Sequence, residues 1–168
     1  MITRIDRKET SAVPRLPFYI PLFNHAVRTF LRLGAPIGNL GLLSVPGRKT
    51  GKMRRNPVGL FQHNGRRYLF STFGEVNWVR NLRAAKYVTV RKGLRTRNAI
   101  AVELNLSEAA EILREVIAPA FLGLGGKIFR SHFPLKPDSP RNDFIEEAKR
   151  HPIFELRDAT PEHHHDEP

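Results

Sequence analysis

Two turn sequences, each flanked by runs of extended character, restrict how this chain of 168 residues can fold. The runs 56–61 and 67–73 surround His63-Asn64-Gly65, and Asn-Gly supplies the two positive φ values that a tight hairpin turn requires. The runs 86–91 and 96–104 alternate apolar and polar residues on either side of Lys92-Gly93. Residues 76–85 lie between the hairpins and have apolar residues at helical spacing. The sequence therefore predicts an antiparallel sheet with a helical crossing.

Further elements are expected on both sides of these hairpins. An amphipathic helix is predicted within 16–33, starting after Pro21, and a short strand at 42–45. Ser107 is interpreted as the N-cap of a helix that Pro119 ends, and a helix at 142–150 precedes an extended piece at 153–156. We expect one domain over residues 1–158 and a polar, disordered tail over 159–168.

Composition narrows the class of protein. Hydrophobic residues make up 40% of the chain and include eleven Phe, so a real core can form. No apolar run reaches the roughly 18 residues of a membrane span, and the charged N-terminus does not resemble a signal peptide, so the cytoplasm is the expected compartment. The absence of cysteine excludes disulfides, thiolate metal sites and cysteine nucleophiles.

Charge is distributed unevenly along the chain. Residues 1–100 carry 20 Lys and Arg against 3 Asp and Glu, whereas residues 101–168 carry 8 against 13, which together give the net charge of +12. The first part therefore favours an anionic partner: nucleic acid, anionic lipid or a phosphorylated small molecule. The sign of the charge alone does not choose among them.

The densest basic segment is 47–55, with five cations in nine residues and glycines at 47 and 51. It is not a Walker A loop, because only three residues separate Gly47 from the Gly51-Lys52 pair and Met53 follows. It can still cradle an oxyanion through backbone N–H groups and cationic side chains. A solvated basic turn is the alternative interpretation.

Hydrolytic and metal chemistry have little support in the sequence. No serine lies in a nucleophile elbow, and no carboxylate pair falls in the basic part, whose acids are Asp6, Glu9 and Glu75. No acidic residue lies at metalloenzyme spacing around His25, His63, His132 or His151, so no metal site is expected.

An ordered series of motifs resembles the deazaflavin-dependent nitroreductase family, whose members are split β-barrel proteins that use coenzyme F420. The series is Gly47-Arg48-Lys49-Thr50-Gly51-Lys52, Arg54 with Asn56-Pro57, Ser71-Thr72-Phe73-Gly74, and Trp78-Val79-Arg80-Asn81-Leu82-Arg83-Ala84 before a Val-Thr-Val strand. The resemblance covers residues 40–104 in these motifs, and more loosely the leading helix and the segment 151–156.

The resemblance implies an α+β fold: a split, mostly antiparallel six-stranded β-barrel with flanking helices. It implies an F420-dependent reductase that transfers a hydride from the reduced deazaflavin to a quinone, nitroaromatic or activated enone. The coenzyme carries a phosphate and an acidic glutamate tail, which would give the basic part a partner. The implied cofactor-binding residues are Arg48, Lys49, Gly51, Lys52, Arg54, Asn56, Pro57, Val58, Ser71, Thr72, Phe73, Gly74, Trp78 and Asn81. No catalytic side chain is named.

Within this set, the cations are assigned to the phosphate and tail, residues 56–58 to the flat ring and residues 71–74 to backbone contacts. Two departures affect the substrate: Gly74 and Trp78 are only four residues apart, and tyrosine occurs only at 19, 68 and 87. The site mouth can therefore differ from that of well-known members.

Alternatives remain open at this point. The same fold could bind FMN or haem, and the charge could serve a nucleic-acid-binding module, although aromatics are not interleaved with the basic turn as stacking on bases requires. Residues 18–33 could attach peripherally to anionic lipid. A homodimer and a small-molecule electron acceptor are the other expected partners.

Overall fold

Six strands close into a barrel in a computed structural model that describes residues 27, 29–30, 33, 38–123 and 132–159. The strands are β1 (Leu40–Pro46), β2 (Met53–His63), β3 (Arg66–Phe70), β4 (Tyr87–Lys92), β5 (Arg95–Glu103) and β6 (Ile153–Asp158). Their order around the barrel is β1-β2-β3-β6-β5-β4, and each pairing, including the closing pair β1–β4, is antiparallel. The expected antiparallel six-stranded barrel with flanking helices is confirmed.

Both predicted hairpins form around the predicted turns. His63 pairs with Arg66 across a turn in which Asn64 and Gly65 have φ values of 49° and 74°. Lys92 pairs with Arg95 across the second turn, where Gly93 has a φ of 59°. The left-handed conformation at these positions explains why Asn and Gly occupy them.

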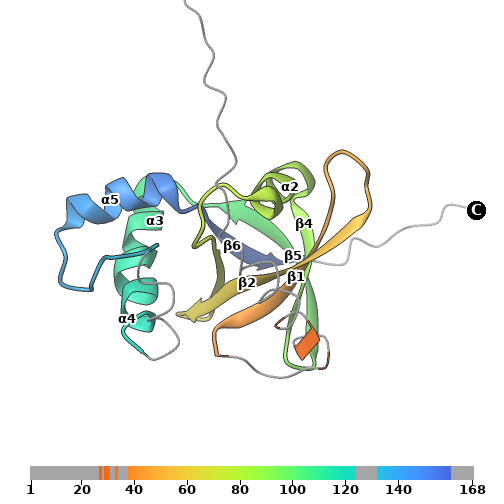
Figure 1. Cartoon of the computed structure of the whole chain (residues 1–168), viewed down its shortest axis with the longest axis horizontal. Coiled ribbons are helices and arrows are strands. Elements are labelled where there is room, and N and C mark those ends of the chain that lie inside the picture. The colour runs from red at the N-terminus through yellow and green to blue at the C-terminus, as the bar shows by residue number, and fades with distance from the viewer. Residues whose placement is uncertain (1–26, 28, 31–32, 34–37, 124–131, 160–168) are drawn as a thin grey trace, which may run out of the picture.

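Helices cover the barrel on one side and at one end. They are α2 (Asn77–Ala85), α3 (Leu106–Ile112), the π-helical turn η1 (Leu113–Ile117), α4 (Ala118–Ala120) and α5 (Arg141–Arg150). Helices α3, α4 and α5 gather on one side, whereas α2 lies across a barrel end beside the turn between β1 and β2 (Figure 1). In the described ranges, no helix combines the length and apolar character that a membrane crossing needs.

Alternation along the strands creates two apolar clusters, one on each face of the sheet. Inside the barrel, residues such as Leu43, Val58 and Leu69 meet Val79 and Leu82 of α2, which close that end. Outside, Phe61, Phe70 and Ile153 of the strands pack against residues of α3, η1 and α5, including Leu113 and Phe144. Helix α2 therefore packs against the apolar cluster inside the barrel, and not against the outer one.

Three predicted boundaries are corrected. The second strand of the first hairpin ends at Phe70, not Phe73, because Ser71 and Gly74 form a turn in which the Ser71 hydroxyl donates to the Gly74 carbonyl at 2.6 Å. The N-cap of α3 is Asn105, not Ser107, and Asn105 and Glu108 form a reciprocal capping box.

The third boundary concerns Pro119, which does not end the helical segment. Helix α4 runs from Ala118 to Ala120 with Pro119 near its start. The preceding π-helical turn shifts the hydrogen-bond register at Leu113–Ile117, so a new helix starts next to Pro119. At the start of a helix a backbone N–H has no helical acceptor, so the missing N–H of proline breaks no helical hydrogen bond there.

Several predictions fall partly on residues that the structure does not describe. Of the helix expected within 16–33, Val27, Thr29 and Phe30 are described and helical, Leu33 is described and lies in a turn, and the rest lies outside the described residues. Most of the proposed membrane-contacting stretch 18–33 and nearly all of the tail 159–168 lie outside them too.

Candidate functional site

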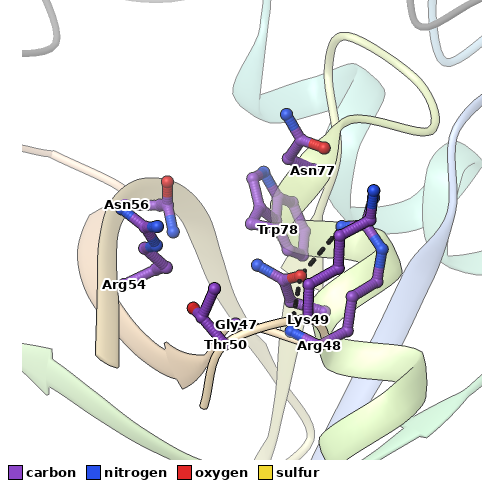
Figure 2. A pocket seen from close by; sticks show the side chains of 9 residues that line it. Gly47, Arg48, Lys49, Thr50, Arg54, Asn56, Asn77 and Trp78 are labelled. Atoms are coloured by element: carbon purple, nitrogen blue, oxygen red, sulfur yellow. Dashed lines mark hydrogen bonds between the residues drawn. The ribbon is translucent and has the colours of Figure 1, made fainter. Parts of the chain in front are cut away.

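A pocket of about 450 Å³ lies between the β1–β2 turn, strand β2 and the start of α2 (Figure 2). Its lining residues come from three segments that are separate in sequence. They are Gly47, Arg48, Lys49, Thr50, Arg54, Asn56, Asn77, Trp78 and Asn81.

The β1–β2 turn is shaped by its own hydrogen bonds. The Gly47 N–H donates to the Lys52 carbonyl at 2.9 Å, and the Thr50 and Gly51 N–H groups donate to the Gly47 carbonyl at 3.2 and 2.7 Å. Gly51 has a φ of +66°, which glycine adopts without strain. Because these three N–H groups are used within the turn, they do not point to an anion in the pocket.

Strand alternation decides which β2 side chains enter the pocket. Arg54 and Asn56 line it, and Val58, two residues further on the same face, is buried inside the barrel. Arg55 and Pro57 lie on the opposite face, where they pair across the strands with Ser44 and Leu42. Of the three residues expected at the flat ring, only Asn56 lines this pocket, and Pro57 and Val58 do not.

Helix α2 supplies the wall opposite β2. Trp78 lines the pocket and also packs against the barrel core, with its ring centroid 6.3 Å from that of Phe154. The i, i+4 spacing of Asn77 and Asn81 places both on the same face of the helix as the pocket. Trp78 thus lines the pocket and also anchors α2 to the barrel core.

Asn81 connects α2 to the basic turn. Its Oδ1 accepts from the Arg48 backbone N–H at 3.2 Å and from Arg48 Nη1 at 2.9 Å, drawn as dashed lines in Figure 2. Because both Arg48 groups can only donate, the oxygen must face them, and the amide nitrogen points away from Arg48. Asn81 is only 7% exposed, so its orientation is fixed by burial as well as by these bonds.

All the charged side chains that line the pocket are cationic. Arg48, Lys49 and Arg54 line it, and none of its nine lining residues is Asp, Glu or His. The acid nearest to α2 in sequence, Glu75, is engaged elsewhere: its carboxylate is 3.1 Å from both Arg80 Nε and Arg83 Nη1. The lining can therefore bind an anion and present an aromatic face, but it offers no carboxylate or imidazole for acid–base work.

Burial alone would raise the pKa of Glu75, but hydrogen bonds and charge attraction from Arg83 and Arg80 outweigh it and hold the pKa below its ordinary value. Hydrogen bonding to Glu103, only partly offset by burial and supported by Glu75, raises the pKa of Arg83 above its ordinary value. This network ties α2 to the preceding turn and to β5.

The structure brings six predicted site residues together in the pocket: Arg48, Lys49, Arg54, Asn56, Trp78 and Asn81. Gly51 and Lys52 belong to the same turn but do not line the pocket. Ser71, Thr72, Phe73 and Gly74 do not line it either. Ser71 is 2% exposed and bonded within its turn, and Phe73 packs against the barrel core and the His132 ring.

Three lining residues were missing from the predicted set. Gly47 and Thr50 belong to the basic turn, from which only Gly51 and the cationic residues were included in the predicted set. Asn77 is the first residue of α2 and lies four before Asn81, so helical spacing from Asn81 could have found it.

Comparison with known proteins assigns the chain to a family. Residues 25–121, more than half of the chain, match the family model described as F420H(2)-dependent quinone reductase. No significant match is found among curated proteins.

The similar solved structures have low sequence identity to this chain. An F420-H2 dependent reductase, FDR-A, is 20% identical, with a TM-score of 0.42 over 71% of this chain and 94% of that chain. The HutZ haem storage protein from Vibrio cholerae is 15% identical, with a TM-score of 0.47 over 81% and 89%. A protein from Bacteroides thetaiotaomicron described as a putative 5-nitroimidazole antibiotic resistance protein is 12% identical, with a TM-score of 0.49 over 77% and 79%. The assignment rests on the family model: the chain belongs to the F420H(2)-dependent quinone reductase family and is an oxidoreductase.

Proposed function

We propose that the chain transfers a hydride from reduced coenzyme F420 to a quinone, nitroaromatic or activated enone. One observation carries this proposal: in a chain of an F420-dependent family, a pocket of about 450 Å³ combines three cations and an aromatic wall with no acidic lining residue. Volumes of this order are typical of sites for small molecules and cofactors. The family match gives no support to FMN as the cofactor.

The residues present suit the coenzyme. Its phosphate and glutamate tail are anionic, and Arg48, Lys49 and Arg54 converge on the pocket from the turn and from β2. Its flat ring requires an aromatic or apolar surface, which Trp78 provides. The Asn81 amide nitrogen adds a donor for a carbonyl or phosphate oxygen, because the oxygen of that amide is already taken by Arg48.

The coenzyme supplies a hydride when bound, and the chain's contribution is binding and orientation. The cations hold the anionic end, and the two bonds to Asn81 keep Arg48 in place while it does so. Trp78 stays rigid because it is packed against the barrel core. A quinone needs a proton as well as a hydride; the nine lining residues include no carboxylate or imidazole, so solvent or the Lys49 ammonium group is the source that the lining leaves.

Other expectations about partners and location stay predictions. Self-pairing of the chain is tested by its molar mass in solution. The small-molecule acceptor is tested by the reaction itself.

The experiment compares hydride donors with menadione as acceptor. Purified protein is supplied with reduced coenzyme F420 or with NADPH, and menadione-dependent oxidation is followed by absorbance. We expect turnover with the deazaflavin and background rates with NADPH. Turnover with NADPH that equals or exceeds the rate with F420 would overturn the proposal.

A further inference from the structure

A buried histidine that does not touch the pocket is joined to its wall by hydrogen bonds. His151 follows α5 and is 5% exposed. Its Nδ1 lies 2.9 Å from the Ser71 carbonyl oxygen, and its Nε2 lies 2.9 Å from Glu147 Oε1. The Phe70 and Phe133 rings pack around the imidazole, with centroids 5.5 and 6.0 Å away.

The partners of His151 fix where its ring carries a proton. A carbonyl oxygen only accepts, so Nδ1 must carry the hydrogen that points at Ser71. Nε2 faces the Glu147 carboxyl group, which is itself buried and lies 3.6 Å from Arg150 Nη1. Two contacts on opposite sides of the ring therefore hold its orientation, and only one of them reaches the Ser71–Gly74 turn.

Hydrogen bonds within the turn and to the segment after α5 occupy the polar groups of Ser71. The Ser71 N–H donates to the Pro152 carbonyl at 3.2 Å, and the Ser71 hydroxyl donates to the Gly74 carbonyl. Gly74 has a φ of +70°, and a Cβ placed there would lie 3.0 Å from the Arg150 carbonyl oxygen. The turn is therefore seated directly on the end of α5, which explains why its residues do not line the pocket.

The turn also determines where α2 begins. The Gly74 carbonyl accepts from the Val76 N–H at 2.9 Å, and Val76 is the N-cap of α2. The Val76 carbonyl accepts from the N–H groups of Val79 and Arg80 at 3.1 and 3.3 Å. The next two residues, Asn77 and Trp78, line the pocket. A continuous path thus runs from His151 through Ser71, Gly74 and Val76 to the pocket wall.

We propose that His151 is a positioning residue: by donating to the Ser71 carbonyl it fixes the turn that starts α2, and so sets where Asn77 and Trp78 stand in the pocket. Its role in coenzyme affinity rests on the proposed function. Its role in placing Trp78 does not. Glu147 contributes by holding the imidazole in this orientation.

Two substitutions at the same position separate the two contacts. An Asn side chain can place its amide nitrogen where Nδ1 lies, so His151→Asn can keep the bond to Ser71 and loses the bond to Glu147. The longer His151→Gln can keep a donor near Glu147 and loses the bond to Ser71. Glu146→Gln is a matched control on α5, because Glu146 is exposed and pairs only with Lys149 among the described residues.

Two readouts are measured for each variant, together with its melting temperature. Trp78 is the single tryptophan of the chain, so the emission of the ligand-free protein reports on the pocket wall. The Kd for coenzyme F420 reports on the site. We expect His151→Gln to shift the emission and raise the Kd about tenfold, and His151→Asn to lower the melting temperature while its emission and Kd stay near wild type.

Unchanged emission in His151→Gln, in a variant that is still folded, would overturn the inference. So would equal changes in emission and Kd for both His151 variants, because a general packing role predicts them. If the wild-type protein binds no coenzyme, the proposed function fails, while the emission still decides the positioning role.

Discussion

Two adjacent arginines of β2 differ in which face of the strand they occupy. Arg54 lines the pocket, whereas Arg55 points to the opposite face and pairs across the strands with Ser44. The two residues carry the same charge and are adjacent in sequence, so they differ chiefly in the face of β2 on which their side chains lie. Arg54→Ala should raise the Kd for coenzyme F420 about tenfold, the effect of losing one charge-assisted hydrogen bond.

Arg55→Ala is the matched control. It removes the same charge from the same strand, and we expect its Kd to change less than about twofold, because a screened surface charge contributes little. Both values come from fluorescence titration at the same salt concentration. Equal effects of the two substitutions would show that the coenzyme responds to overall charge and not to the pocket.

At the level of whole elements, the hairpins and α2 were predictable because their signals are local. Asn64-Gly65 and Lys92-Gly93 specify turns, and period-two alternation specifies the strands beside them. Alternation could also have excluded Pro57 from the pocket lining, since Pro57 cannot share a face with Asn56. The end of β3 at Phe70 was not predictable, because it depends on Pro152 and His151, which lie far away in sequence.

Contacts between residues far apart in sequence also limited what could be predicted about the site. Arg48 could be picked out from its basic motif, but its bond to Asn81 joins residues 33 positions apart. The contact of residues 71–74 with the end of α5 and with His151 is likewise tertiary, so the sequence could suggest this turn as a binding segment but could not show these contacts.

Helix α2 is held at its start by an ion-pair network that should respond to pH. Arg83 lies 3.1 Å from Glu75 and 2.7 Å from Glu103, and Arg80 also contacts Glu75. Because the pKa of Glu75 is lowered in the folded state, this carboxylate contributes stability above its ordinary value of 4.5 and loses that contribution as the pH falls through the lowered pKa. Glu75→Gln should reduce the free energy of unfolding by about 0.5–1 kcal/mol at pH 7, the range for partly exposed ion pairs.

Urea unfolding at pH 7 and at successively lower pH measures this difference. The deficit of Glu75→Gln relative to wild type should shrink below the ordinary pKa, as the wild-type carboxylate also becomes neutral. Glu146→Gln, which removes an exposed i, i+3 pair with Lys149, should show little deficit at either pH. A Glu75→Gln deficit that persists unchanged in acid would mean that packing and not charge is lost.

On the scale of the whole molecule, folding partly neutralises the charge imbalance between the two parts of the sequence. Arg67 pairs with Asp158, Arg66 lies 3.7 Å from Glu155 and Arg83 contacts Glu103, so acids of the second part meet cations of the first. The pocket has no such partner among its lining residues. The positive charge of the pocket is therefore not neutralised by its own lining, and it lies where we propose that the anionic coenzyme binds.

This distribution predicts that salt weakens coenzyme binding and that the pocket cations carry the effect. Lys49 and Lys52 belong to the same turn, but only Lys49 lines the pocket. Between about 0.05 M and about 0.5 M NaCl, where screening shortens the reach of exposed charges severalfold, the Kd of the wild type should rise. Lys49→Ala should raise the Kd about tenfold at low salt and flatten its salt dependence, whereas Lys52→Ala should follow the wild type closely.

A coenzyme precursor without the glutamate tail separates the two anionic groups. Its Kd should depend less on salt than that of the full coenzyme, because fewer charges are screened, and Lys49→Ala should affect it less if Lys49 faces the tail. An equal effect of Lys49→Ala on both ligands would place the phosphate at Lys49. Lys49→Ala binding both ligands like wild type at low salt would show that the cations of this turn are solvated, and the assignment of the pocket to the coenzyme would then lose its electrostatic basis.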